Sequence, residues 1–152
     1  MVRWLTATFA ALTLLLPSTA LAGPTRAEQA LLREMNRVRA AHGLAPLRND
    51  LHLERAARSH TSAMLATNAF RHGAFDSRMQ RFDVRGRLAG ENLAWGSGES
   101  GSARGIVDMW LASPEHRANL LRPSFRRVGV ADRVGSFRGI SAAHVVTADF
   151  AG

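Results

Sequence analysis

The chain has 152 residues, a formal net charge of +8 and no cysteine. A chain of this length can bury the core of one domain, and the lack of cysteine excludes both a disulfide framework and a thiol nucleophile. All basic residues are arginines, scattered without a run interleaved with aromatic residues. This pattern argues against nucleic-acid binding and favours attraction to anionic lipid head groups or acidic envelope polymers.

Residues 1–22 have the pattern of a secretory signal peptide. Arg3 precedes an apolar run over residues 5–16, and Ala20 to Ala22 form an A-x-A cleavage site. A membrane anchor, the alternative, is disfavoured because the run is shorter than the roughly 20 residues that a span needs. The sequence therefore predicts a bacterial protein exported as residues 23–152, either secreted or held in the periplasm or cell envelope, with a net charge of +7 once Arg3 is removed.

Two long helices are predicted in the first half of that domain. A capping box of Thr25 and Glu28 begins the first helix, which ends near Gly43 and is followed by a turn, GLAPLRND. The second helix covers about residues 51–68 and places His60 on its apolar face. A histidine in that position is expected to be a hydrogen-bonded core residue.

The second half begins with irregular structure and ends in strands. Residues 70–90 are expected to be irregular, and a short apolar piece from Gly90 leads into a flexible Gly/Ser loop. A third helix over 103–112 and a short fourth one, from Ser113 to before Pro123, come next. Two strands within 125–150 alternate in hydrophobicity around a predicted hairpin. Helices followed by a hairpin indicate an α+β sandwich.

Three dispersed polar residues are the candidates for chemistry, because the sequence contains no HExxH, P-loop or GxSxG motif. They are His72 in FRHG, Glu91 in AGENLAWG and His116 in SPEHR. Two neutral imidazoles and a carboxylate can coordinate zinc with one position left open. The same trio can act without metal if Glu91 orients a histidine that accepts a proton. The helix start at Ser113 favours a neutral His116, because the positive end of the helix dipole disfavours imidazolium.

The order of five motifs resembles that of the CAP superfamily, which comprises cysteine-rich secretory proteins, antigen 5 and pathogenesis-related proteins. The motifs are FRHG, GENLAWG, DMWLASPEHRANLL, FRRVGVA and VVTADFA. The sequence is most similar to the bacterial branch without cysteine, whose members carry an SCP-like domain. The resemblance covers essentially residues 23–152. It implies an α-β-α sandwich, with a small antiparallel sheet between helical layers and a large cleft.

The resemblance also implies a cleft lined by two histidines and two acidic residues, which in some members hold zinc or another divalent ion. His72 matches the first histidine, Glu91 the glutamate of the GEN motif, and His116 the second histidine. Many relatives have a glutamate at the position of Ser113, so the candidates for the fourth member here are Glu115 and Asp108. No catalytic residue is assigned.

The leading functional hypothesis is a secreted, non-enzymatic domain that binds lipid or another envelope component through the His/Glu cleft, with a weakly bound divalent metal as an option. The resemblance supports it, since CAP proteins are associated with sterol, lipid and protein binding. One alternative is a peptidase-like hydrolase that uses the His/Glu cluster with or without metal. Another is a cell-surface module for protein interaction through loop 97–102 and the Arg-rich segment 78–87.

Overall fold

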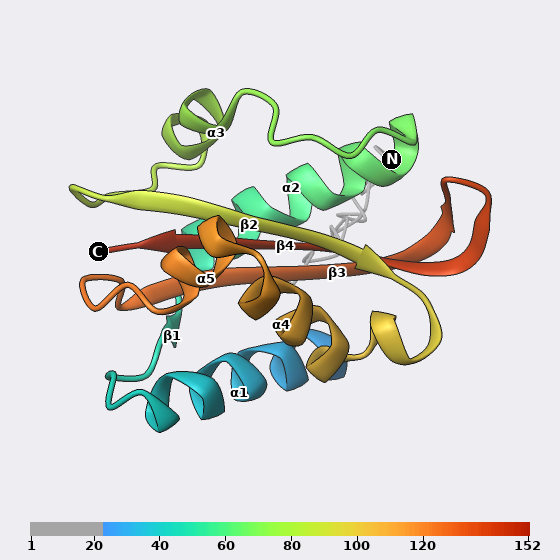
Figure 1. Ribbon diagram of the computed structural model, residues 1–152. Helices are drawn as coiled ribbons and strands as arrows, with labels where there is room; N and C mark the ends of the chain where they lie inside the picture. The colour runs from blue at the N-terminus through green and yellow to red at the C-terminus, as the bar shows by residue number, and fades with distance from the viewer. Residues whose placement is uncertain (1–22) are drawn as a thin grey trace, which may run out of the picture.

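The computed structural model describes residues 23–152, so the predicted signal peptide lies outside the described residues. Helices and strands are interspersed along this part of the chain (Figure 1). Their order is α1 (Arg26–Ala41), β1 (Arg48–Asn49), α2 (Leu51–Thr67), α3 (Phe75–Arg81), β2 (Ala89–Gly96), the 3-10 turn η1 (Gly98–Gly101), α4 (Ala103–Ala112), α5 (Pro114–Leu120), β3 (Arg127–Phe137) and β4 (Ile140–Ala151).

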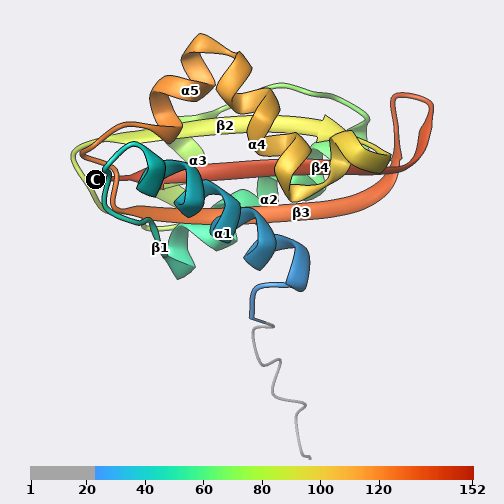
Figure 2. The same cartoon turned by 60° about the horizontal axis from the view of Figure 1, so that its bottom comes forward.

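The strands form one sheet in the order β1-β3-β4-β2. Helices α2 and α3 lie on one face of the sheet, and α1, α4 and α5 lie on the other (Figures 1 and 2). The predicted α-β-α sandwich is therefore confirmed. The sheet is mixed and not purely antiparallel, because β1 pairs in parallel with β3 through Arg48 and Asn49. Both residues fall in the stretch that was predicted to be only a turn.

The larger core lies between the sheet and the layer of α1, α4 and α5. The predicted inward faces of α1 and α4 are buried there against β3 and β4. Their members are Leu31, Met35, Val38, Ile106, Val107 and Trp110. On the opposite face, α2 buries Leu53 and Met64 against the sheet and α3. Since the described part of the chain has no disulfide, these two layers of packing stabilise the domain.

The predicted helix boundaries are confirmed in most cases. In α1 the Thr25 hydroxyl accepts a hydrogen bond from the Glu28 N–H at 3.2 Å, and the Glu28 carboxylate accepts one from the Thr25 N–H at 2.7 Å. Asn68 ends α2 in the left-handed conformation, with φ of 51°. Helix α5 begins at Pro114 as expected, although the Ser113 side chain makes no capping hydrogen bond.

Two segments differ from the sequence prediction. Residues 75–81, expected to be irregular, form α3, which is too short to show a clear helical period and buries only Met79. The Gly/Ser loop, expected to be flexible, packs closely around η1. A Cβ atom on Gly96 would lie 2.6 Å from the Ser100 carbonyl oxygen, and one on Gly105 would lie 2.4 Å from that of Glu99. These glycines therefore allow close contact between backbones.

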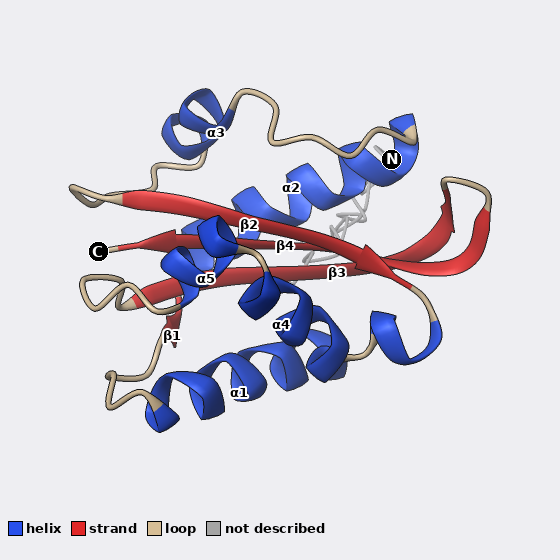
Figure 3. Ribbon diagram, viewed as in Figure 1, coloured by secondary structure: helices blue, strands red, loops and turns tan. Residues whose placement is uncertain are grey.

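The predicted hairpin joins β3 to β4 (Figure 3). Its turn residues Arg138 and Gly139 have φ values of 50° and 82°, which suit the twist of a two-residue hairpin. Val128 and Val130 are buried as predicted, whereas Val134 is 56% exposed because β3 extends beyond the helical layer there. None of the helices within residues 23–152 is long and apolar enough to cross a membrane.

Candidate functional site

Glu91 of β2 is the centre of a cluster of polar side chains drawn from several elements. Its Oε1 atom lies 2.7 Å from Nδ1 of His72, in the connection between α2 and α3. Its Oε2 atom accepts a hydrogen bond from Arg78 of α3. Arg78 also lies 3.5 Å from an oxygen of Asp149, which the sheet register places opposite Glu91 on β4. The fold thus gathers two carboxyl groups, an arginine and a histidine.

The two acids are buried and share one arginine. Burial raises the pKa of Glu91 to about 7, against the opposing effect of Arg78. Burial also raises the pKa of Asp149 well above its ordinary value, and the charge of Glu91 adds to this rise. Within the described residues, Nε of Arg78 and Oδ2 of Asp149 are buried without a hydrogen-bond partner. The pair therefore retains protons more readily than exposed carboxylates do.

His60 of α2 borders this cluster. Its Nε2 atom lies 2.9 Å from the Arg71 carbonyl oxygen and 3.6 Å from Oε2 of Glu91. Burial, reinforced by the charge of Arg78, lowers the pKa of His60 to about 4. The prediction of a buried, hydrogen-bonded histidine is confirmed. The sequence pattern did not reveal that this residue also faces Glu91.

The surroundings of His116 of α5 favour its neutral form, in the direction that the sequence predicted. Burial lowers its pKa, and the charge of His72 lowers it further, while Glu115 opposes the shift. The dominant cause is therefore burial and not the helix dipole that the sequence suggested. His72 therefore acts on His116 through its charge, whereas its direct contact is with Glu91.

Side-chain amides hold α5 against β2. The Asn92 amide donates to the carbonyl oxygen of His116 at 2.9 Å. The Asn119 amide donates to the carbonyl oxygen of Glu91 at 3.2 Å and to the Asn92 side chain at 3.1 Å. These bonds fix the position of His116 relative to Glu91.

A cavity of about 280 Å³ lies beside His116, at the edge of β2. Its wall is apolar apart from His116 and Ser113, and it includes the side chains of both tryptophans in residues 23–152. The lining residues are Phe70, Leu93, Ala94, Trp95, Met109, Trp110, Ser113 and His116. Trp110 is fully buried and donates from Nε1 to the Leu93 carbonyl oxygen at 3.0 Å, which confirms its predicted place in the core or cleft wall.

The two candidates for a fourth member lie outside the Glu91 cluster. Glu115 is exposed on α5, and Asp108 is exposed on α4, with Arg104 3.7 Å away. The buried acid next to Glu91 is instead Asp149. Its sequence signal was an acidic residue inside the otherwise apolar strand VVTADFA. Arg78 gave no such signal, since its helix was not predicted.

The Glu91 cluster does not fit a resident divalent ion in this arrangement. His72 and Arg78 contact the two carboxylate oxygens of Glu91, and Arg78 places a positive charge where a cation would bind. In the part of the chain that the structure describes, no group of three or more His, Cys, Asp or Glu residues is arranged to hold a metal. The side chains around Glu91 therefore form a network of hydrogen bonds and ion pairs in place of the zinc site that the resemblance implies.

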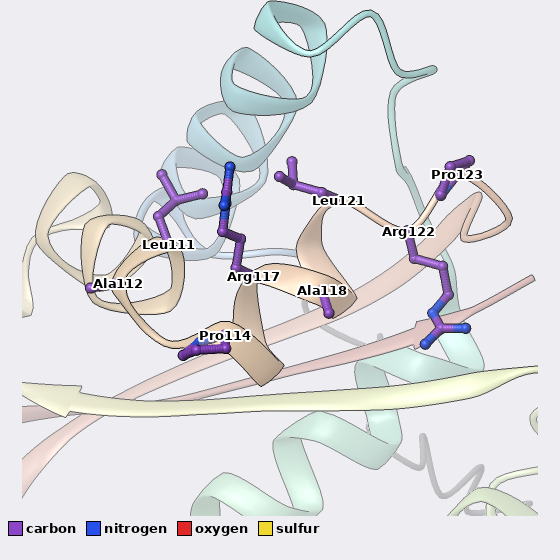
Figure 4. Close-up of a pocket in the computed structure, with 8 residues that line it drawn as sticks. All are labelled: Leu111, Ala112, Pro114, Arg117, Ala118, Leu121, Arg122 and Pro123. Atoms are coloured by element: carbon purple, nitrogen blue, oxygen red, sulfur yellow. The ribbon is translucent and has the colours of Figure 1, made fainter.

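A second, larger cavity of about 690 Å³ follows the end of α4 and the outer side of α5 (Figure 4). Two arginines project from its otherwise apolar lining, with Arg117 rising between Leu111 and Leu121 and Arg122 pointing away from them. We call this surface the α5 groove. Its lining residues are Leu111, Ala112, Pro114, Arg117, Ala118, Leu121, Arg122 and Pro123.

Comparison with known protein families gives a match over most of the chain. The model described as "Cysteine-rich secretory protein family" (CAP) matches residues 32–150. The uncharacterized protein YkwD of Bacillus subtilis is 32% identical over 108 residues, which are 68% of this chain and 41% of YkwD. The human Golgi-associated plant pathogenesis-related protein 1 is 30% identical over 95 residues, 62% of this chain and 55% of that protein. The chain thus spans less than half of YkwD.

Solved structures give a matching fold. An extracellular protein from Bacillus anthracis that contains an SCP domain superposes with a TM-score of 0.65 and 30% identity, covering 82% of this chain and 39% of that one. An outer surface protein from Borrelia burgdorferi gives a TM-score of 0.68 over 80% of this chain and 89% of its own. At 21% identity, the likeness to the Borrelia protein concerns the fold alone.

Proposed function

The chain belongs to the cysteine-rich secretory protein (CAP) family, and on this basis we propose that it binds anionic amphiphiles, such as envelope lipids, outside the cell. Export is supported by the signal-peptide pattern of residues 1–22 and by the extracellular protein with an SCP domain to which the chain is similar. Binding without catalysis is supported by the lack of a nucleophile motif and by the engagement of both Glu91 oxygens.

The observation that carries the proposal is the α5 groove. Its volume of about 690 Å³ lies within the roughly 300–1,000 Å³ typical of small-molecule sites. Leucine, alanine and proline side chains can cover an acyl chain, while Arg117 and Arg122 can pair with a phosphate or carboxylate. Both residues are exposed, and within residues 23–152 neither forms an ion pair with a carboxylate, although the Arg122 guanidinium lies 5.3 Å from the ring centre of Phe125.

A buried arginine holds the wall of this groove in place. Arg39 of α1 is fully buried and donates to the carbonyl oxygens of Leu120, Arg122 and Phe125 at 2.7, 3.1 and 3.0 Å. These bonds fix the chain that follows α5. Since ordering a binding surface in advance reduces the entropy lost on binding, a groove fixed in this way favours affinity.

Sedimentation with lipid vesicles tests the proposal. At low salt the protein is expected to associate with phosphatidylcholine vesicles that contain phosphatidylglycerol, and to bind pure phosphatidylcholine at least tenfold more weakly. The double variant Arg117→Glu, Arg122→Glu should lose this preference, whereas Arg104→Glu, on the exposed face of α4, should keep it. Salt should weaken binding, because it screens the charges of exposed groups. Equal binding to both kinds of vesicle would contradict the proposal.

The alternative hydrolase is favoured by one observation, the His72–Glu91 pair. The His72 side chain is 59% exposed and bonded to a carboxylate, which is the arrangement of a general base held in one tautomer. A screen of peptide and ester substrates tests this alternative. Activity should fall in both His72→Ala and His116→Ala, and activity unchanged in both variants would identify a contaminant.

A further inference from the structure

A basic pocket of about 680 Å³ lies at the edge of the sheet that β1 forms. It is found where the connection between α1 and β1 meets the start of β3, and we call it the β1 pocket. Three of its six lining residues are arginines and none is acidic. The six are Ala45, Pro46, Arg48, Asn49, Arg126 and Arg127. None of them lines the α5 groove, so the two surfaces are separate sites.

Two of these arginines have no acidic partner. Arg127 forms an ion pair with Asp50, with an N–O distance of 2.8 Å. Arg48 and Arg126 are exposed, and within residues 23–152 neither forms an ion pair with a carboxylate. The Arg48 N–H donates to the Arg126 carbonyl oxygen at 2.9 Å, so both side chains start from adjacent backbone. The pocket therefore presents two neighbouring cations whose charge is not balanced.

A buried cation lies behind the wall of the β1 pocket. Arg39 of α1 is fully buried, and its guanidinium donates to the carbonyl oxygens of Ala45 at 2.9 Å and of Phe125 at 3.0 Å. In the part of the chain that the structure describes, its hydrogen bonds all go to carbonyl oxygens and none to a carboxylate. Burial lowers the pKa of Arg39, and the charge of Arg126 lowers it further. An anion in the pocket would offset this repulsion between the two arginines.

Helix α1 holds both walls of the pocket in place. Arg39 joins the wall at Ala45 to the chain that precedes β3, because it binds both segments. The Asn36 side chain accepts from the Leu47 N–H at 2.7 Å and donates to the Leu47 carbonyl oxygen at 3.0 Å. Leu47 is buried and directly precedes Arg48. The backbone that carries the cations is thus ordered before a ligand arrives, which reduces the entropy lost on binding.

We propose that the β1 pocket binds a soluble anion with two linked phosphate groups, such as pyrophosphate. The guanidinium groups of Arg48 and Arg126 each present parallel N–H groups that match a pair of phosphate oxygens. The lining has no aromatic ring on which a nucleobase could stack, and its only apolar side chains are those of Ala45 and Pro46, too small to cover an acyl chain. The phosphate groups themselves therefore supply the affinity, and the volume of the pocket leaves room for more than one of them.

Calorimetric titration with inorganic pyrophosphate at low salt tests the proposal. One pyrophosphate should bind for each chain, about tenfold more tightly than orthophosphate, because the second phosphate gains charged hydrogen bonds to a second guanidinium. Arg48→Gln and Arg126→Gln should each weaken binding about tenfold for the same reason. Arg117→Gln makes the same change in the α5 groove and should leave the affinity unchanged.

NMR locates the anion, since pyrophosphate should shift the Nε–H resonances of Arg48 and Arg126. Unchanged resonances, or equal affinity in wild type and in both variants of the β1 pocket, would overturn the proposal. Citrate that binds as tightly as pyrophosphate would also overturn it, because the pocket would then select negative charge and not linked phosphates.

A phosphate group can also come from a lipid head group, and vesicles distinguish the two sources. Arg48→Gln should weaken binding to vesicles that contain phosphatidylglycerol no more than Arg104→Gln does, since both remove one exposed charge. A larger loss in Arg48→Gln would place a head group in the β1 pocket and overturn the assignment to a soluble anion. The pyrophosphate titration contains no lipid, so its result is independent of lipid binding in the α5 groove.

Discussion

Glu28 and Glu91 are two buried glutamates whose pKa values shift in opposite directions. Burial alone would raise the pKa of Glu28, but hydrogen bonds from Arg58 and the Thr25 N–H, with the charges of Arg58 and Arg133, lower it. Glu91 has the opposite balance, and burial raises its pKa to about 7. The two residues are only 1% and 7% exposed, so both carboxylates are shielded from solvent.

The difference lies in the number of cations for each carboxylate. Glu28 contacts two arginines, Arg58 at 2.8 Å and Arg133 at 3.1 Å. Glu91 shares the single Arg78 with a second buried acid, Asp149. The charge of Glu28 is balanced by these arginines, and its ion pairs hold α1 against α2 and β3. Glu91 is a buried carboxylate whose charge is only partly balanced, and its pKa is perturbed. Such a perturbed pKa is typical of functional sites, although structural ion networks also produce one.

The largest effect is expected for Glu28→Gln. The substitution removes the carboxylate that Arg58 and Arg133 share and leaves Arg58 paired with Glu54 at 2.8 Å, while the glutamine amide oxygen can still accept from the Thr25 N–H in the capping box. Breaking a buried ion pair from one side typically destabilises by about 3–5 kcal/mol, and partial exposure of both arginines places this variant near the lower limit. Urea unfolding measures the loss. A loss below about 1 kcal/mol would show that Glu28 is not the compensated partner described above.

A smaller effect with a distinct pH dependence is expected for Glu91→Gln. The folded state raises the pKa of Glu91 from 4.5 to about 7, so the folded protein binds the proton more tightly than the unfolded chain does. The contribution of Glu91 to stability is therefore greatest below about 4.5 and is lost as pH rises to about 7. The variant should be most destabilised near pH 4.5, and the difference from wild type should shrink towards pH 8.

Glu28 provides the matched control for this pH profile. Its folded pKa lies below 4.5, so its contribution is present above that pH and is lost on acidification. The difference between wild type and Glu28→Gln should accordingly grow with rising pH, opposite to that for Glu91→Gln. Urea titrations across pH 4–8 measure both profiles. If the loss of stability changed with pH in the same direction for both variants, the contrast between the two glutamates would be wrong.

The sequence predicted most of the fold because helix faces and caps are local patterns. The apolar stripe of α1, the capping box at Thr25 and the hairpin of β3 and β4 each depend on residues close in the chain. Helix α3 has seven residues and one buried apolar side chain, too few to show a period. β1 is a pair of residues whose strand character depends on distant β3. Such elements follow from tertiary contacts, which no local pattern records.

The sequence predicted part of the candidate site. The motif order identified His72, Glu91 and His116, but it did not show which groups neutralise the buried Glu91. Arg78 lies on an unpredicted helix, and Asp149 reaches Glu91 only through the register of β2 and β4. Burial raises the pKa of Glu91 while the neighbouring charge of Arg78 opposes the rise, and the charges around Glu91 cause the poor fit to a metal. Those charges come from segments separated by up to 71 positions in the chain.

A zinc titration tests the role of Arg78. Wild-type protein is expected to take up zinc weakly, because the guanidinium contacts the Glu91 oxygen that a metal would need. Arg78→Gln should bind zinc about tenfold more tightly, with affinity rising with pH as protons leave the histidines. Calorimetry at two pH values measures this change, and Arg104→Gln, on the exposed face of α4, is the control. Tight binding by wild type would show that the metal displaces Arg78.

The smallest effect is expected at Glu115, which the sequence offered with Asp108 as a fourth member of the cleft. Glu115 raises the pKa of His116, against the larger lowering by burial and His72. Because Glu115 is exposed, solvent screens its charge, and Glu115→Gln should lower the pKa of His116 only slightly. Asp108→Asn should leave it unchanged, since Asp108 faces Arg104 on the surface of α4. NMR titration of the His116 ring measures both variants. A shift of about one unit in either would place that acid in direct contact with His116 and restore it to the site.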